Sequence, residues 1–180
     1  MVKRFFDELY DKYHKDLFQF IIYMVKDRNL AEDLVQDVYI KVIKSYHSFD
    51  GRSSEKTWLF SIARHVTIDY FRKQKRKRNR IMDFFDWGDK GENIQGVDAL
   101  PEEIAIQNAE MKAVYKALDE CTMDQKSVII FRYIQGMSIQ ETADILNWTE
   151  SKVKTTQHRG MKALREILEK AKEGGVQREA

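Results

Sequence analysis

Apolar residues recur at helical spacing along most of this 180-residue chain, and this periodicity constrains the fold more than any other feature. The pattern i, i+3, i+4 runs from 6 to 24, from 31 to 46 and from 59 to 70. One proline and eight glycines leave few turn residues for an all-β protein. The sequence therefore predicts an all-α fold.

The segment 79–101 interrupts this periodicity. It carries glycines at 88, 91 and 96, is strongly acidic and ends at the lone Pro101. We predict two small helical domains, a three-helix type over 5–78 and a second over 102–172, joined by an acidic linker over 79–101. The tail 173–180 is predicted to be disordered. Phe84, Phe85 and Trp87 are unusual in a free linker and are expected to dock on the first domain or on a partner.

Capping signals place several helix starts. Asn29 with Glu32, Thr122 with Gln125 and Ser138 with Glu141 each have capping-box spacing. One helix is expected from about Glu102 to Leu118. The run VIIFRYI (128–134) suits a strand or a buried helix, and its place between caps favours a helix.

Charge is segregated although the net charge is only +2. The run RKQKRKRNR (72–80) has seven basic residues and no acid, whereas 83–103 is acidic. A second group of basic residues recurs between 152 and 165. Such clusters attract polyanions, and nucleic acid is the first candidate; a solvated helix end is the alternative.

The segment 139–153 has the pattern of a helix-turn-helix. Ala143 is small where two helices cross, Asn147 tolerates a left-handed turn, and Val153 provides an apolar anchor. The second helix then presents short polar and basic side chains suited to base edges and phosphates. An ordinary helical hairpin is the alternative, but the basic second helix favours DNA binding.

The first half has nucleic-acid features of its own. Aromatic residues such as Phe49, Trp58 and Tyr70 alternate with cations such as Lys56 and Arg64. Unpaired bases stack on aromatic rings while cations follow the backbone, so this mixture favours single-stranded or melted DNA. For each aromatic ring taken singly, core packing is the alternative.

Asp33 and Asp37 lie one helical turn apart, and three interpretations stay open from spacing alone. The pair can hold a metal, accept arginines from a protein partner, or form a solvated helix face. No Glu-x-x-His or third ligand accompanies them, and no histidine stands beside a nucleophile in a motif. The single cysteine, Cys121, excludes an intrachain disulfide. The sequence therefore predicts no enzyme, no cofactor and no metal site; a nuclease using Asp33, Asp37 and Asp69 is a remote alternative.

In combination, the motifs resemble those of a bacterial RNA polymerase sigma factor of the extracytoplasmic-function (ECF) group. The resemblance covers 9–168 and rests on AEDLVQDVYIKV (31–42), SFDGRSSEKTWLFSIARHVTIDYFRKQKRK (48–77) and MSIQETADILNWTESKVKTTQHRGMKALRE (137–166). It implies sigma region 2, which melts the promoter −10 element, and sigma region 4, which reads the −35 element. It also implies binding to the clamp and flap of core RNA polymerase, to duplex and melted promoter DNA, and to an anti-sigma factor, with no small-molecule substrate.

The resemblance assigns candidate site residues by matching positions. Core polymerase binding falls to Asp33, Gln36 and Asp37. Binding to the −10 region falls to Phe49, Gly51, Ser53, Ser54, Lys56, Trp58, Arg64, His65, Arg72 and Lys73, where His65 replaces an asparagine frequent in the family. Binding to the −35 element falls to Lys152, Lys154, Thr155, His158 and Arg159, whereas Thr156, Gln157 and Met161 depart from the commoner choices.

A stand-alone helix-turn-helix regulator is the alternative function, and it predicts protection of an operator without polymerase. No apolar run in the chain approaches the roughly 20 residues that span a bilayer, and the N-terminus lacks the features of a secretory signal. The expected location is the cytoplasm, with retention at the membrane if an anti-sigma factor there binds the chain.

Overall fold

The computed structural model describes residues 1–85 and 101–176, and every helix or strand assigned over these ranges is a helix. The first half contains α1 (Val2–Val25), α2 (Arg28–Ser45), the 3-10 turn η1 (Tyr46–Ser48) and α3 (Glu55–Phe85). The second half contains α4 (Glu102–Ala105), α5 (Ala109–Ala117), η2 (Leu118–Glu120), α6 (Met123–Ile129), the π-helical η3 (Ile130–Ile134), α7 (Ile139–Leu146) and α8 (Glu150–Val176). The all-α prediction is confirmed.

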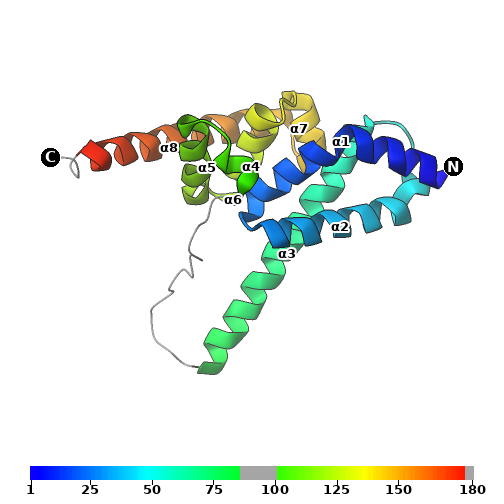
Figure 1. Cartoon of the computed structure of the whole chain (residues 1–180), viewed down its shortest axis with the longest axis horizontal. Helices are drawn as coiled ribbons and strands as arrows, with labels where there is room; N and C mark the ends of the chain where they lie inside the picture. The colour runs from blue at the N-terminus through cyan, green and yellow to red at the C-terminus, as the bar shows by residue number, and fades with distance from the viewer. Residues whose placement is uncertain (86–100, 177–180) are drawn as a thin grey trace.

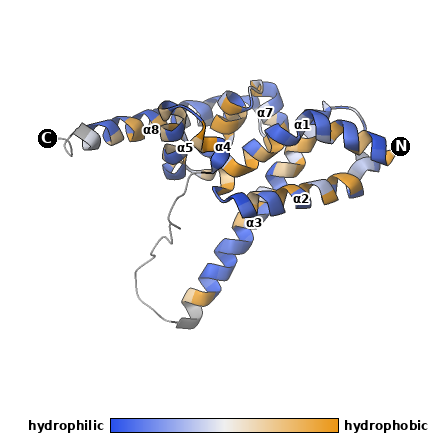
Figure 2. Cartoon of the chain, in the orientation of Figure 1, coloured by the Kyte–Doolittle hydropathy of each residue, from blue (hydrophilic) through white to orange (hydrophobic). Residues whose placement is uncertain are grey.

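In the first half, α1 and α2 form an antiparallel pair, and α3 packs across both before its C-terminal part leaves the body of the molecule (Figure 1). The apolar stripes of the three helices meet in a core that includes Leu17, Val38 and Leu59. The projecting part of α3 is largely hydrophilic (Figure 2). Its residues from Arg72 to Met82 are all exposed.

In the second half, α8 packs against α6, and α7 lies between α8 and the first half (Figure 1). The run 128–134 is helical, as predicted, but it passes from α6 into the π-helical η3. α7 packs on α3, and one continuous core joins the two halves. The halves are therefore in direct contact in this structure.

Two of the three predicted capping boxes are confirmed, at Thr122 and at Ser138. The third is wrong: α2 begins at Arg28 because the Asp27 side chain accepts a hydrogen bond from the Leu30 amide at 2.9 Å. Aspartate caps a helix as well as asparagine does, so Asn29 falls inside the first turn. Glu32 instead pairs with Arg28 at 3.2 Å.

Other helix boundaries also differ from the predictions. The expected helix from Glu102 to Leu118 is broken at 106–108, because the Asn108 side chain accepts from the Met111 amide and starts α5. The α3 helix continues to Phe85, so 79–85 of the predicted linker is helical. α8 continues to Val176, so 173–176 of the predicted tail is helical as well. The predicted docking of Phe84, Phe85 and Trp87 lies outside the described side chains.

Candidate polymerase and nucleic-acid interface

An exposed face of α2 carries the predicted polymerase-binding residues. Asp33, Gln36 and Asp37 are exposed. The apolar residues of α2 pack on the core, so these three side chains lie on the opposite side of the helix. Ile40 and Ile43, which are 49% and 50% exposed, continue this face by one further turn. We call these five residues the α2 face. The two isoleucines were missed from the sequence, although they fall outside the buried stripe of α2.

The loop before α3 rests on a cluster of aromatic rings. The ring of Phe49 lies 4.8 Å from that of Trp58, and Phe5 lies 4.8 Å from Tyr46 and within 6.2 Å of both Phe49 and Trp58. Phe49 and Trp58 are partly buried in this cluster, so only part of each ring is open to solvent. Core packing therefore accounts for part of their role.

The polar residues of this loop are shaped by local turns. Gly51 has a φ of +74°, a conformation that side chains disfavour. The Ser54 hydroxyl accepts a hydrogen bond from the Thr57 amide at 3.1 Å and so caps α3. Gly51 and Ser54 are exposed and Ser53 is partly buried.

Two predicted residues of α3 face the second half or the body of the first. Lys56 pairs with Asp16 at 3.6 Å. Arg64 is partly buried, and its Nε has no hydrogen-bond partner among the described residues. Burial lowers the pKa of the Arg64 guanidinium, and the nearby carboxylate of Asp124 partly offsets this.

Three predicted residues lie on other parts of α3. His65 is exposed, and its Nδ1 lies 2.7 Å from the Ser61 carbonyl oxygen. Arg72 pairs weakly with Asp69 at 3.9 Å, and Lys73 is exposed. The structure therefore does not gather all the predicted −10 residues in one place.

Shallow hollows between α2 and α3 bring together basic residues that the sequence did not connect. Lys41 and Lys44 of α2 line the same hollow as His65, and they line a second hollow with Lys73. Their helical spacing on α2 was visible in the sequence, but their proximity to α3 depends on the crossing of the two helices.

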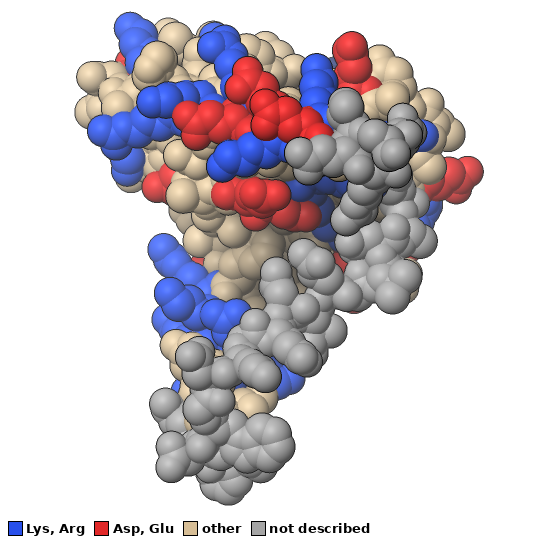
Figure 3. Space-filling model, turned by 90° about the vertical axis from the view of Figure 1, so that its left-hand side faces the viewer, with Lys and Arg blue, Asp and Glu red and all other residues tan. Residues whose placement is uncertain are grey.

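The basic run of 72–80 forms the arm that projects from the body. Among the described residues, Arg72 is the member of this run that takes part in an ion pair. Lysine and arginine side chains gather on the upper part of the arm in Figure 3. A helix with like charges on all sides is suited to a polyanion.

The helix-turn-helix prediction is confirmed in its geometry. Asn147 ends α7 with φ 55° and ψ 46°, in the left-handed region, and Ala143 and Val153 are buried between the helices. The exposed side of α8 carries the predicted −35 residues, namely Lys152, Lys154, Thr155, His158 and Arg159. The Lys152 ammonium lies 3.9 Å from the centre of the Trp148 ring, which orients it beside the turn.

Gln157, one of the residues that depart from the commoner choices in the family, is bound by Arg132. The Arg132 Nε donates to the Gln157 side chain at 2.9 Å, and Arg132 also donates to the Met137 carbonyl. One guanidinium therefore ties η3 to α8 and to the segment before α7. Arg132 was missed from the sequence because its side-chain partner, Gln157, is 25 residues away along the chain.

No group of three or more His, Cys, Asp or Glu side chains is arranged to hold a metal ion within 1–85 and 101–176. Over the same ranges, no helix is both long and apolar enough to cross a membrane.

Comparison with known proteins agrees with this arrangement. Residues 9–77 match the family model Sigma-70 region 2, and 111–164 match Sigma-70, region 4. The chain is 58% identical to the ECF RNA polymerase sigma factor SigX of Bacillus subtilis, over 93% of this chain and 86% of that protein. It is 30% identical to the RNA polymerase sigma factor YlaC of the same organism, over 93% of this chain and 94% of that protein.

A solved structure with the same fold is the sigma factor RpoE of Bartonella quintana in complex with the anti-sigma factor NepR. It is 29% identical, with a TM-score of 0.72, and the match covers 91% of this chain and 96% of that one. Both halves of the molecule thus match, in order, the two regions of one kind of transcription factor, and the chain belongs to the ECF group of sigma-70 family RNA polymerase sigma factors.

Proposed function

We propose that this chain directs promoter-specific transcription initiation by binding core RNA polymerase, reading the −35 element and stabilising the melted −10 element. The observation that carries the proposal is the presence, in one chain, of the α2 face and of an exposed helix-turn-helix surface. The family of the chain supports the same function.

The α2 face is the proposed contact with the polymerase clamp. It combines two exposed carboxylates with two exposed isoleucines, Ile40 and Ile43. Carboxylates accept bidentate hydrogen bonds from arginines, and apolar side chains supply the buried centre of an interface. The composition of the α2 face therefore favours binding to a protein partner over a role as a solvated helix surface.

The loop 49–54 and the first turns of α3 are the proposed site for melted DNA. Extruding a base costs a few kcal/mol, and stacking on an aromatic side chain returns roughly 1–3 kcal/mol per base. Because Phe49 and Trp58 are already partly buried against each other, stacking alone does not offset melting. The chain therefore opens promoters only with the additional contacts that polymerase supplies.

The exposed side of α8 is the proposed −35 reader. In helix-turn-helix proteins the second helix enters the major groove while the first crosses the backbone. Thr155, His158 and Arg159 are exposed on this helix, which supports contacts from their polar side chains to base edges and phosphates. The matched structure contains an anti-sigma factor, and we infer that this chain has such a partner as well. We also infer that it acts in the cytoplasm, where it meets polymerase and promoter.

Run-off transcription tests the function directly. Core polymerase is assayed with and without this chain on a panel of promoter templates. We expect specific transcripts only when the chain is present. Protection of a palindromic operator by the chain alone, without transcripts, would support a stand-alone regulator instead.

The assignment of the α2 face has a matched test. The double substitution Asp33→Ala, Asp37→Ala should weaken capture of core polymerase at least tenfold, because it removes both carboxylates of the face. The control is Asp7→Ala, Asp11→Ala, which removes two exposed carboxylates with the same spacing from α1. Equal capture by both variants in a pull-down with sigma-free polymerase would show that the α2 face is not the contact.

A further inference from the structure

The turn of the helix-turn-helix carries a tryptophan to which the sequence motifs assign no role. The amide of Trp148 donates to the Ala143 carbonyl at 2.9 Å, across the left-handed Asn147, so the turn fixes its backbone. Its side chain is partly buried and packs against the core. Trp148 therefore offers a fixed aromatic surface at the point where α7 passes into α8.

The ring of Trp148 holds the ammonium of Lys152, which follows it by one helical turn. The ammonium lies 3.9 Å from the centre of the ring. The Lys152 amide donates to the Thr149 hydroxyl at 3.2 Å, so Thr149 caps α8 and Lys152 is in the first turn of that helix. The Lys152 side chain therefore runs back toward the turn between α7 and α8.

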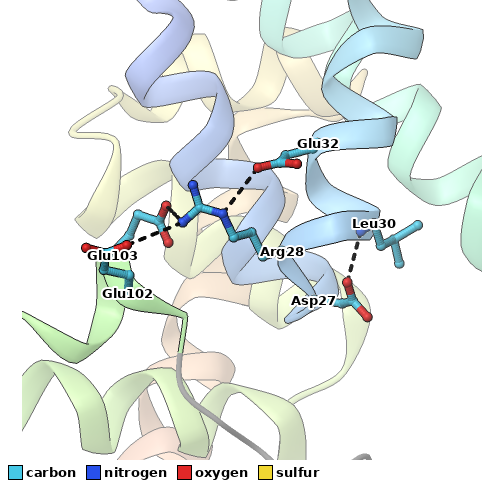
Figure 4. A network of polar contacts seen from close by, with 6 residues as sticks. All are labelled: Asp27, Arg28, Leu30, Glu32, Glu102 and Glu103. Atoms are coloured by element: carbon cyan, nitrogen blue, oxygen red, sulfur yellow. Dashed lines mark hydrogen bonds and ion pairs between the residues drawn. The ribbon is translucent and has the colours of Figure 1, made fainter.

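Lys152 differs from the other cations that lie over aromatic rings in the described ranges. Each of those also pairs with a carboxylate, namely Lys26 with Asp119, Arg28 with Glu32 and Glu103, and Lys56 with Asp16. Figure 4 shows the Arg28 guanidinium between the carboxylates of its partners. Lys152 pairs with no carboxylate of residues 1–85 or 101–176. The described part of the chain therefore leaves its charge available to an external anion.

The place of this charge also favours an anion. The N-terminal end of a helix is electropositive because its first amides lack partners within the helix, and a cation there is disfavoured. A phosphate at the same place is attracted by both the amides and the ammonium. Lys152 is exposed, so a phosphate can reach it from solvent.

The DNA backbone is the anion that the rest of α8 selects. Lys152, Thr155 and Arg159 follow the spacing i, i+3, i+7 and therefore share one face of the helix. In helix-turn-helix proteins the second helix enters the major groove and the first crosses the backbone. The turn between α7 and α8 is then next to a strand at the edge of the groove. Lys152 would meet a phosphate there, while residues further along α8 meet bases.

We propose that Trp148 is a positioning residue for binding the −35 element, whose ring holds the Lys152 ammonium in place to pair with a phosphate beside that element. The inference rests on the proposed function of α8 as the −35 reader. A lysine side chain loses rotamer freedom when it binds, and the ring reduces this loss by restricting Lys152 beforehand. Phosphate contacts carry no direct sequence information, so Trp148 sets affinity and register and leaves base preference to other residues.

A double-mutant cycle tests the proposal in holoenzyme reconstituted from core polymerase and the full chain. Trp148→Leu, Lys152→Met and the double variant are compared by fluorescence anisotropy on a promoter duplex chosen from the run-off transcription panel. Trp148→Leu should weaken binding about threefold, the size expected for the loss of an exposed cation–π contact. In the Lys152→Met background the same change should alter binding by less than about 1.5-fold, because the ring then has no ammonium to hold.

The salt dependence of binding identifies the ligand of Lys152. Lys152→Met should reduce the magnitude of the slope of log K against log salt by about 0.9, the value for one phosphate contact on duplex DNA. Lys170→Met removes an exposed lysine from the far end of α8 and should leave the slope unchanged. An unchanged slope in Lys152→Met would contradict the phosphate contact. So would a changed order of preference among −35 sequences in Trp148→Leu.

A conservative variant separates positioning from folding. Trp148→Phe keeps an aromatic face and should retain most of the binding that Trp148→Leu loses. In the free chain, the ring current of Trp148 should shift the ε-methylene protons of Lys152 upfield in the NMR spectrum, and Trp148→Leu should remove the shift. An equal loss of binding from Trp148→Leu with and without Lys152→Met would show that Trp148 acts through the fold of the turn, which overturns the inference.

The outcomes also distinguish this inference from the proposed function. If the parent chain gives no specific transcripts with core polymerase, the proposed function fails, and the inference fails with it. If the parent chain supports transcription and the Trp148→Leu holoenzyme binds the promoter as tightly as the parent does, the inference alone is overturned.

Discussion

Among the described residues other than glycine, Asn147 and Lys26 have left-handed backbone conformations, with φ of 55° and 58°. Asparagine tolerates this region, so the turn at Asn147 was predictable. Lysine does not favour the left-handed region, and nothing in the neighbouring sequence predicted this conformation at Lys26. In this conformation the Lys26 side chain contacts the second half. Its ammonium forms an ion pair with Asp119 at 3.1 Å and lies 4.0 Å from the centre of the Tyr115 ring. Tertiary contacts therefore account for the left-handed conformation of Lys26.

The turn residue supports a prediction about stability. Asn147→Ala should lower the free energy of unfolding by about 1 kcal/mol, since alanine lacks the local hydrogen bonding that lets asparagine adopt this conformation. Asn147→Gly should change it by less than about 0.5 kcal/mol, because glycine adopts positive φ without a steric cost. Urea unfolding followed by circular dichroism measures both. Equal losses in the two variants would show that the Asn147 side chain, not its backbone, stabilises the turn.

At the scale of the elements, apolar periodicity correctly predicted that the helices exist. It did not predict the residues at which they begin and end. Asp27 and Asn108 cap helices that the sequence placed differently, because several residues near each end can cap. The arm of α3 is a different case. Its charges repel each other along the helix, with Lys73 and Lys77 one turn apart, and each like-charged pair costs a few tenths of a kcal/mol.

The arm should therefore become more stable when a polyanion binds. We expect the backbone amides of 72–82 to exchange hydrogen more slowly when single-stranded DNA is added. An uncharged nucleic-acid analogue of the same sequence is the control, and it should leave exchange unchanged. Equal protection by both ligands would rule out charge neutralisation as the cause.

At the scale of the whole molecule, the contact between the halves includes a buried ammonium. Lys126 pairs with Asp119 of η2 at 3.5 Å, and Lys26 and Cys121 also influence it. Burial is the main cause that lowers the pKa of Lys126 from 10.5 to about 8, while Asp119 opposes the shift. The unfolded chain thus binds more protons than the folded chain between about pH 8 and 10.5. The contribution of Lys126 to the free energy of unfolding should rise with pH across this window.

This linkage can be measured as a difference between two chains. In a Cys121→Ser background, the unfolding free energy of the Lys126 chain relative to Lys126→Met should increase by about 1–2 kcal/mol from pH 7.5 to 9.5. Urea titrations at the two values measure it, and the range stays below the region where Tyr39 titrates, since burial raises the pKa of that phenol. Parallel pH dependence in the two chains would exclude Lys126 as the source.

The sequence by itself determined the helical class, the helix-turn-helix with its left-handed Asn147 and the family, because periodicity, capping and turn chemistry act between neighbours in the chain. It also predicted which α2 and α8 residues are exposed, since helical spacing separates them from the buried stripes. Only the tertiary structure decided that Lys41 and Lys44 approach α3, that Arg132 binds Gln157 and that Phe131 packs against Phe20 and Phe60. These contacts join residues far apart in sequence, and they depend on how helices cross, which local spacing does not encode.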